Sequence, residues 1–173
     1  AGMNLTERDF QVHYSSRALL ADLLAQAGIE QSFHPAVFLA LDKRGKIPDP
    51  EIELLLKQAG LDESAAGAAM KLSGIGTLEQ AAAMAGAGSQ SAAALAELRR
   101  RMEEYGMGGY MLFDIGVVRG LGYYTGAVFE AFATGAGMRA IFGGGRYGRL
   151  LRDLGGGEMT AVGLGFGDVV IAD

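Results

Sequence analysis

The chain has 173 residues, no cysteine and a net charge of −5. It is long enough for one domain of ordinary size, and the missing cysteines exclude disulfides and cysteine-ligated zinc. We see no membrane-spanning stretch and no signal peptide, so we expect a soluble, cytoplasmic protein without membrane contact. The acidic balance argues against nucleic-acid binding over the whole surface, because phosphate contacts require a basic excess.

Residues before 107 contain the start and stop signals of short helices. A strand is expected over Asp9–His13, with Ser15 or Ser16 capping the helix that follows and Gly28 ending it. Five more helices are expected: from His34–Pro35 to Gly45, from a cap at Asp49 to Gly60, from Asp62, from a Thr77–Gln80 capping box, and over a stripe of Leu95, Leu98, Met102 and Tyr105. Tyr105 and the methionines are expected to fill the core.

The basic cluster Arg99–Arg101 lies among glutamates. On a helix these residues form three pairs four positions apart, namely 97/101, 99/103 and 100/104. We therefore expect a solvated, self-paired helix face and not a nucleic-acid patch.

The later residues favour strands and are rich in glycine. Strands are expected over Tyr110–Asp114, Gly122–Ala133, Met138–Phe142 and, buried, Thr160–Phe166, with a hairpin turn at 134–137 and a helical turn or two over Arg149–Leu154. The predicted fold class is α+β, with a helical lobe followed by an antiparallel β-sheet with flanking helices.

Three segments can carry chemistry. The first runs from Arg119 through Tyr123, Tyr124 and Thr125 to Glu130, and an arginine beside glycine can approach a carboxylate or phosphate closely. The second, residues 142–147, sets three glycines at an expected strand end before Arg146, and the third, residues 161–167, places glycines at alternate positions. The residue types equally allow a structural salt bridge, core tyrosines, a bend and close packing.

Taken in order, these segments resemble the histidyl-tRNA synthetases. That family carries the motifs R-G-L-x-Y-Y-T-G-x-V-F-E and G-G-G-R-Y-x-x-L and then a glycine-rich third class II motif, and residues 119–167 follow the same order. The LDKRGKIP stretch at 41–48 resembles a piece of the family's helical insertion. The resemblance implies that 1–33 are a strand and helix of the catalytic core, 34–106 the insertion, and 107–173 the C-terminal part of the core.

The resemblance implies histidine activation with ATP and transfer to tRNA(His), by a parent enzyme that is a homodimer and uses Mg²⁺ with ATP. Arg119 then matches the catalytic arginine at the α-phosphate and the substrate carboxylate. The implied histidine-binding residues are Tyr123, Tyr124, Gly143, Gly144, Arg146 and Tyr147. The implied ATP-binding residues are Arg119, Thr125, Gly163, Gly165 and Gly167. No metal is expected in this chain, and His13 and His34 lack a metal-ligand spacing.

The chain also departs from the family pattern. Gly122 and Gly148 replace the commoner aspartates, and Val170 stands where an adenine-stacking arginine is usual. Class II motifs 1 and 2 have no counterpart before residue 10, so we expect a fragment that binds histidine at most and is inactive alone. Two alternatives stay open: the synthetase-like regulatory subunit of ATP phosphoribosyltransferase, and a free-standing interaction module.

Overall fold

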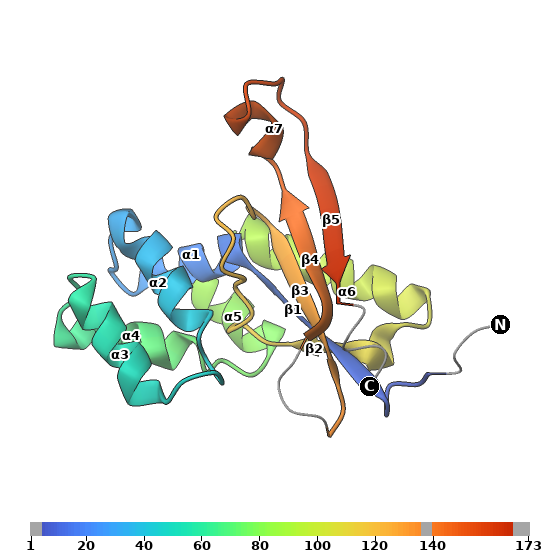
Figure 1. The fold of residues 1–173 in the computed structure, drawn as a ribbon, viewed down its shortest axis with the longest axis horizontal. Coiled ribbons are helices and arrows are strands. Elements are labelled where there is room, and N and C mark those ends of the chain that lie inside the picture. The colour runs from blue at the N-terminus through green and yellow to red at the C-terminus, as the bar shows by residue number, and fades with distance from the viewer. Residues whose placement is uncertain (1–4, 136–139, 168–173) are drawn as a thin grey trace.

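The computed structural model describes residues 5–135 and 140–167. Its described part contains one five-stranded sheet with helices around it (Figure 1). The strands are β1 (Phe10–Ser16), β2 (Met111–Phe113), β3 (Ala127–Ala133), β4 (Ala140–Tyr147) and β5 (Ala161–Phe166), in the spatial order β2-β1-β3-β4-β5. The α-helices are α1 (Arg17–Gln26), α2 (His34–Leu41), α3 (Asp49–Gln58), α4 (Glu63–Leu72), α5 (Leu78–Ala85), α6 (Gln90–Glu104) and α7 (Leu150–Asp153). Short 3-10 helices lie at η1 (Gln31–Phe33) and η2 (Gly108–Tyr110).

The helices begin where short polar side chains can cap them. The side chains of Ser16, Asp62 and Thr77 each accept a hydrogen bond from the backbone N–H three residues on, which confirms these predicted caps. Two boundaries were wrong. Asp49 is the first residue of α3 and Pro48 precedes it without a side-chain cap, and α2 ends at Leu41, before Gly45.

The fold is α+β as expected, but its sheet is not wholly antiparallel. β1 pairs with β2 in parallel, and the other three pairings are antiparallel. The parallel pair follows from the long helical connection between β1 and β2, which brings the chain back to the same end of the sheet. The predicted turn at 134–137 lies partly outside the described residues.

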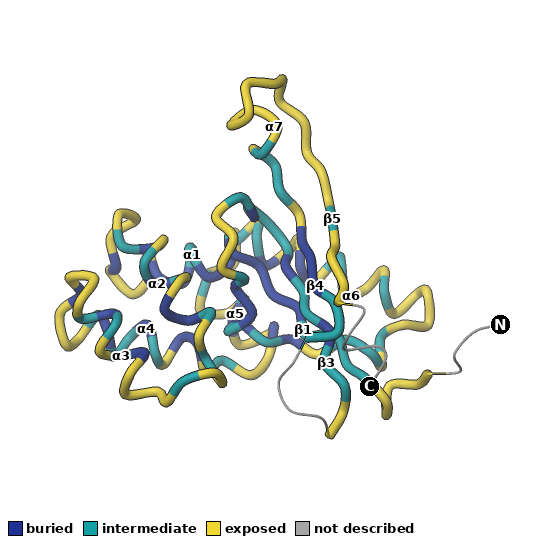
Figure 2. The backbone as a smooth tube through the Cα atoms, viewed as in Figure 1, coloured by how far each residue is buried: buried dark blue, intermediate teal, exposed yellow. Residues whose placement is uncertain are grey.

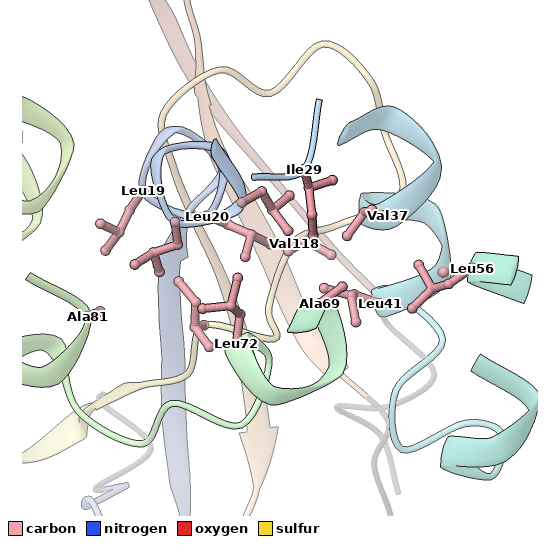
Figure 3. Packing of buried hydrophobic residues seen from close by; sticks show 14 of the residues in the cluster. Leu19, Leu20, Ile29, Val37, Leu41, Leu56, Ala69, Leu72, Ala81 and Val118 are labelled. Carbon is pink, nitrogen blue, oxygen red and sulfur yellow. The ribbon is translucent and has the colours of Figure 1, made fainter. Parts of the chain in front are cut away.

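One large hydrophobic cluster joins the sheet to helices α1 to α6. Its side chains come from both sides of the predicted boundary at residue 34, as Figure 3 shows for Leu19, Leu20, Leu41, Leu72 and Val118. The expected core position of Tyr105 is wrong, because its side chain is 81% exposed just after the end of α6. Several methionines, among them Met159, are exposed too.

The β4–β5 hairpin and α7 extend beyond this core as an arm. Figure 2 draws β5 and the stretch around α7 largely as exposed, and most of β4 as buried or intermediate. The expectation of a buried last strand is wrong: Val162, Leu164 and Phe166 are all largely exposed on β5. β5 is an edge strand within the described part of the sheet, so no further strand covers its outer side there. Its glycines contribute no side chains that could pack against their neighbours. None of the helices in the described ranges is long and apolar enough to cross a membrane.

The exposed face of α6 is paired with itself. Arg99 contacts Glu103 at 3.0 Å, Arg101 contacts Glu97 at 2.7 Å, and Arg100 contacts Glu104. These are the three pairs that the sequence predicted. The bonds from Arg100 and Arg101 lower the pKa of the Glu97 carboxyl to about 2.

Candidate functional site

One face of the sheet carries few side chains over β4 and β5, because glycines occupy several of its positions. Side chains alternate between faces along a strand, so cross-strand partners in register share a face. One register row on this face reads His13, Glu130, Gly143, Gly165, and the next reads Ser15, Val128, Gly145, Gly163. The glycines therefore leave backbone accessible beside Glu130 and Val128.

Residues 114–126 cover this face as a loop. Asp114 starts it with a turn, in which its carboxylate accepts from the Gly116 N–H and its carbonyl from the Val117 N–H, both at 3.0 Å. The prediction of a strand from Gly122 is therefore wrong, since β3 begins at Ala127. Tyr123 and Tyr124 lie in the loop and do not point to opposite faces of a strand.

Three tyrosines that the resemblance placed near histidine lie together, two from the loop and Tyr147 from the end of β4. The ring centroids of Tyr123 and Tyr124 are 4.7 Å apart, and both rings lie against Tyr147 at 5.5 and 6.2 Å. Tyr124 packs with Val117 and Val128 in a small buried cluster of its own. These phenols can both donate and accept hydrogen bonds, as recognition of a neutral imidazole requires.

Arg119 is held in a fixed place at the edge of this cluster. Its Nη1 donates to Oε1 of Glu130 at 2.5 Å, and its guanidinium lies 5.9 Å from the centre of the Tyr124 ring. Burial disfavours the charged form, but the interactions with Glu130 and Tyr124 together outweigh it and raise the pKa of Arg119. The structural salt bridge that the residue types also allowed is thus present. It holds the positively charged guanidinium of Arg119 over Gly143.

Three glycines provide the space for these side chains. A Cβ on Gly143 would collide with Nη1 of Arg119, and one on Gly145 would lie 2.9 Å from the Tyr124 ring. A Cβ on Gly163 would lie 2.6 Å from the hydroxyl of Tyr147. The expectation that 143–145 lie at a strand end is wrong, because they lie inside β4 with partners on both sides. Their small size lets Arg119 and the tyrosines seat directly on backbone.

Other predicted site residues lie elsewhere. Arg146 pairs with Val162, so it faces the opposite side of the sheet from Gly143 and Gly145. With Thr125 it lines a hollow of about 980 Å³ against α1 and the α5–α6 connection. The Thr125 hydroxyl accepts from the Gly148 N–H at 2.8 Å.

Gly144 also faces that opposite side, because it pairs with Phe129 and Leu164. Gly165 lies on the face of Arg119, and an added Cβ there would meet nothing within 4 Å. Gly167 follows β5 and its N–H donates to the Ile141 carbonyl at 3.2 Å. Val170 lies outside the described residues.

A second hollow, of about 730 Å³, lies between this sheet face and the helices, and Glu130 lines it. His13 lies there too, and its Nδ1 is 3.2 Å from Oδ2 of Asp114. Burial alone would raise the pKa of Asp114, but the bonds from His13 and the Gly116 N–H outweigh it and lower the pKa. His34 is buried, with Nε2 3.1 Å from the Ile29 carbonyl, in a structural position.

The sequence reading assigned no role to Glu130, His13 or Asp114. Glu130 stands in the first motif, and alternation along its strand would have put it on the face of Val128. The His13–Asp114 contact joins residues 101 positions apart and has no local signal. Over residues 5–135 and 140–167, no three His, Cys, Asp or Glu side chains are grouped as a metal site would need.

The chain is similar to known proteins over nearly its whole length. A family model described as Histidyl-tRNA synthetase matches residues 3–167. The histidine–tRNA ligase of Arabidopsis thaliana chloroplasts and mitochondria is 37% identical over 99% of this chain, which spans 35% of that protein. The chain thus covers about a third of this curated relative.

Two solved structures share the fold. A histidyl-tRNA synthetase from Nostoc sp. PCC 7120 superposes with a TM-score of 0.83 at 21% identity, over 96% of this chain and 42% of its own. A Bacillus halodurans C protein, described as an ATP phosphoribosyltransferase regulatory subunit/histidyl-tRNA synthetase, gives 0.73 at 24% identity, over 91% and 42%. With the family model covering almost every residue, the resemblance is confirmed: the chain belongs to the histidyl-tRNA synthetase family.

Proposed function

We propose that this chain supplies the histidine pocket of a histidine–tRNA ligase. The observation that carries the proposal is the convergence of Arg119, Tyr124 and Tyr147 over the glycines of β4 and β5. The tyrosine cluster would receive the imidazole, and Arg119 would receive the carboxylate. We also propose that residues 34–106 are the helical insertion and that 1–33 and 107–173 belong to the catalytic core.

The proposed reaction joins histidine to ATP and then to tRNA(His). The histidine carboxylate attacks the α-phosphate, pyrophosphate leaves, and histidyl-adenylate forms. A hydroxyl at the 3′ end of the tRNA then attacks the acyl carbon, and AMP leaves. A permanently charged guanidinium at Arg119 stabilises the negative charge on the phosphoryl oxygens without any proton transfer. Gly165 would lie beneath the nucleotide, because the space over it is open, whereas the Tyr147 hydroxyl fills the space over Gly163.

The pocket would read histidine through hydrogen bonds. A phenol can accept from the ring N–H or donate to the bare ring nitrogen, and a site built on such bonds rejects ligands that cannot complete them. Tyr124 has the fixed position this needs, since it is buried between Val117 and Val128 and its ring rests on Gly145. Arg146 and Thr125 line the other hollow, against α1, and are not part of the proposed imidazole contact.

Mg²⁺ would enter with ATP, and no step is assigned to it, because the described residues offer no metal-ligand group. A cytoplasmic location and a homodimer of the whole protein belong to the same proposal. Alone, the chain should bind histidine and not carry out aminoacylation.

The regulatory subunit of ATP phosphoribosyltransferase is the second candidate. Its supporting observation is the shared fold of the Bacillus halodurans C protein, but at 24% identity this likeness is one of fold alone. The histidine–tRNA ligase is favoured because a relative of that name is 37% identical over nearly the whole chain. An anticodon-binding domain encoded downstream of residue 173 would support the ligase.

Ligand-observed NMR competition tests the proposal. The purified chain is mixed with histidine, and 1-methylhistidine, phenylalanine and glutamine are added in turn as competitors. Histidine should bind saturably and phenylalanine and glutamine should not displace it. A Tyr124→Phe variant should bind more weakly, by about tenfold for one lost hydrogen bond. Displacement of bound histidine by phenylalanine would contradict a pocket that recognises the imidazole.

A further inference from the structure

We propose that Glu130 is the positioning residue for Arg119, fixing its guanidinium over Gly143 before any ligand arrives. The ligand-binding part of the test rests on the proposed function, and the inference concerns how that site is built. Glu130 lies directly opposite Gly143 in the β3–β4 register, on the face that the loop covers. Its carboxylate thus stands beside Gly143, over which the Arg119 guanidinium is seated.

Three observations show that the position of Arg119 is held by its surroundings. Its backbone has φ +54°, the one positive φ at a non-glycine residue among those described. A left-handed backbone is strained for a residue with a side chain, and persists only where neighbouring structure imposes it. Gly143 leaves the space that the guanidinium fills, and Glu130 supplies the charge-assisted hydrogen bond at 2.5 Å.

Glu130 also lies in register with the strand on its other side. In the same register row its neighbour on β1 is His13, which is tied to Asp114 at the start of the loop. Asp114 and Arg119 thus belong to one loop that is attached to the sheet at two places. Both side chains of the Arg119–Glu130 pair are about one-fifth exposed, so solvent screens this pair less than a surface pair.

The pair leaves part of the guanidinium available. The hydrogen bond that the structure gives to Arg119 uses Nη1 alone, and a guanidinium carries five N–H donors. A ligand carboxylate or phosphate can therefore bind the remaining donors while Glu130 stays in place. Holding the fork in advance lowers the entropy that binding would otherwise lose.

The first test needs no ligand. The Nη1–H signals of Arg119 are assigned by NMR with an Arg119→Lys variant, and their hydrogen exchange is compared in wild type, Glu130→Gln and Glu130→Ala. We expect exchange on the order of tenfold faster in Glu130→Ala, with Glu130→Gln intermediate because an accepting oxygen remains. Glu158→Ala, which removes a carboxylate from exposed Arg152, is the matched control and should change nothing at Arg119.

The second test compares histidine with histidinol, which has the imidazole but no carboxylate. Glu130→Ala should weaken histidine binding by about tenfold and leave histidinol binding unchanged, because only the carboxylate depends on Arg119. Equal weakening of both ligands would assign Glu130 a merely structural role and overturn the inference. An Arg119 signal in Glu130→Ala that exchanges as in wild type would overturn it too. If wild type binds neither ligand but Arg119 exchange still responds to Glu130, the positioning role stands and the proposed histidine pocket of this chain fails.

Discussion

Gly144 in the middle of β4 offers the sharpest test of how this sheet is built. A Cβ placed there would lie 2.8 Å from the Leu164 Cα and 2.9 Å from Cζ of Phe129, and closer still to the Gly163 carbonyl oxygen. Ordinary contacts between carbon atoms are about 3.5–4.0 Å, so Gly144→Ala must push strands apart by roughly 1 Å. Overpacking of this kind costs about 1–3 kcal/mol of the free energy of unfolding.

Gly165 is the matched control on the neighbouring strand. A Cβ there meets nothing within 4 Å, and its backbone is not left-handed. Gly165→Ala should equal wild type or gain up to about 1 kcal/mol, because alanine reduces the entropy of the unfolded chain. Thermal unfolding followed by circular dichroism should show Gly144→Ala melting roughly 2–12 °C below wild type, at about 2–4 °C per kcal/mol. If Gly144→Ala and Gly165→Ala melt together, the close packing of β3, β4 and β5 is contradicted.

Three further predictions follow from single contacts. Gly143→Ala should displace the flexible end of Arg119 and weaken histidine binding about tenfold in calorimetry, with a smaller loss of stability than Gly144→Ala; unchanged binding would contradict this seat for the guanidinium. Because the fold lowers the pKa of Asp114, its ionised carboxylate stabilises the folded protein at pH values above the unfolded pKa of about 3.9. This stabilisation is lost as the pH falls through the folded pKa. Wild type should therefore lose more stability in urea titrations below about pH 4 than Asp114→Asn does, and parallel losses would refute the role of the carboxylate. Asp62→Ala should cost about 1 kcal/mol in the same assay, because the Ala65 N–H loses its cap, and no loss would mean that the cap adds nothing.

The helical part of the fold was predictable because its signals are local. The caps at Asp62 and Thr77 act on a backbone N–H three residues away, and the ion pairs of α6 join residues four apart. The strand part was harder. The aromatic and threonine content of residues 122–126 is typical of strands, yet the turn at Asp114 takes the loop across the sheet. The burial of β5 depends on what packs over it, which its own residues do not encode.

The candidate site was predictable in its residue types but not in its arrangement. The motifs identified Arg119, Tyr124 and Tyr147, and the structure brings them together. The same motifs grouped Arg146 with them, although alternation along β4 turns it to the other face. The partner of Arg119 required the register between β3 and β4, a relation between distant residues that neither motif states.

Calorimetric titration of this chain with histidine tests the central claim most directly. Wild type is compared with Arg119→Ala and, as a control outside the site, Arg152→Ala. We predict saturable binding that Arg119→Ala weakens by about tenfold or more and that Arg152→Ala leaves unchanged. A folded chain that binds no histidine, or binds it equally well without the Arg119 guanidinium, would contradict the histidine pocket proposed on this sheet face.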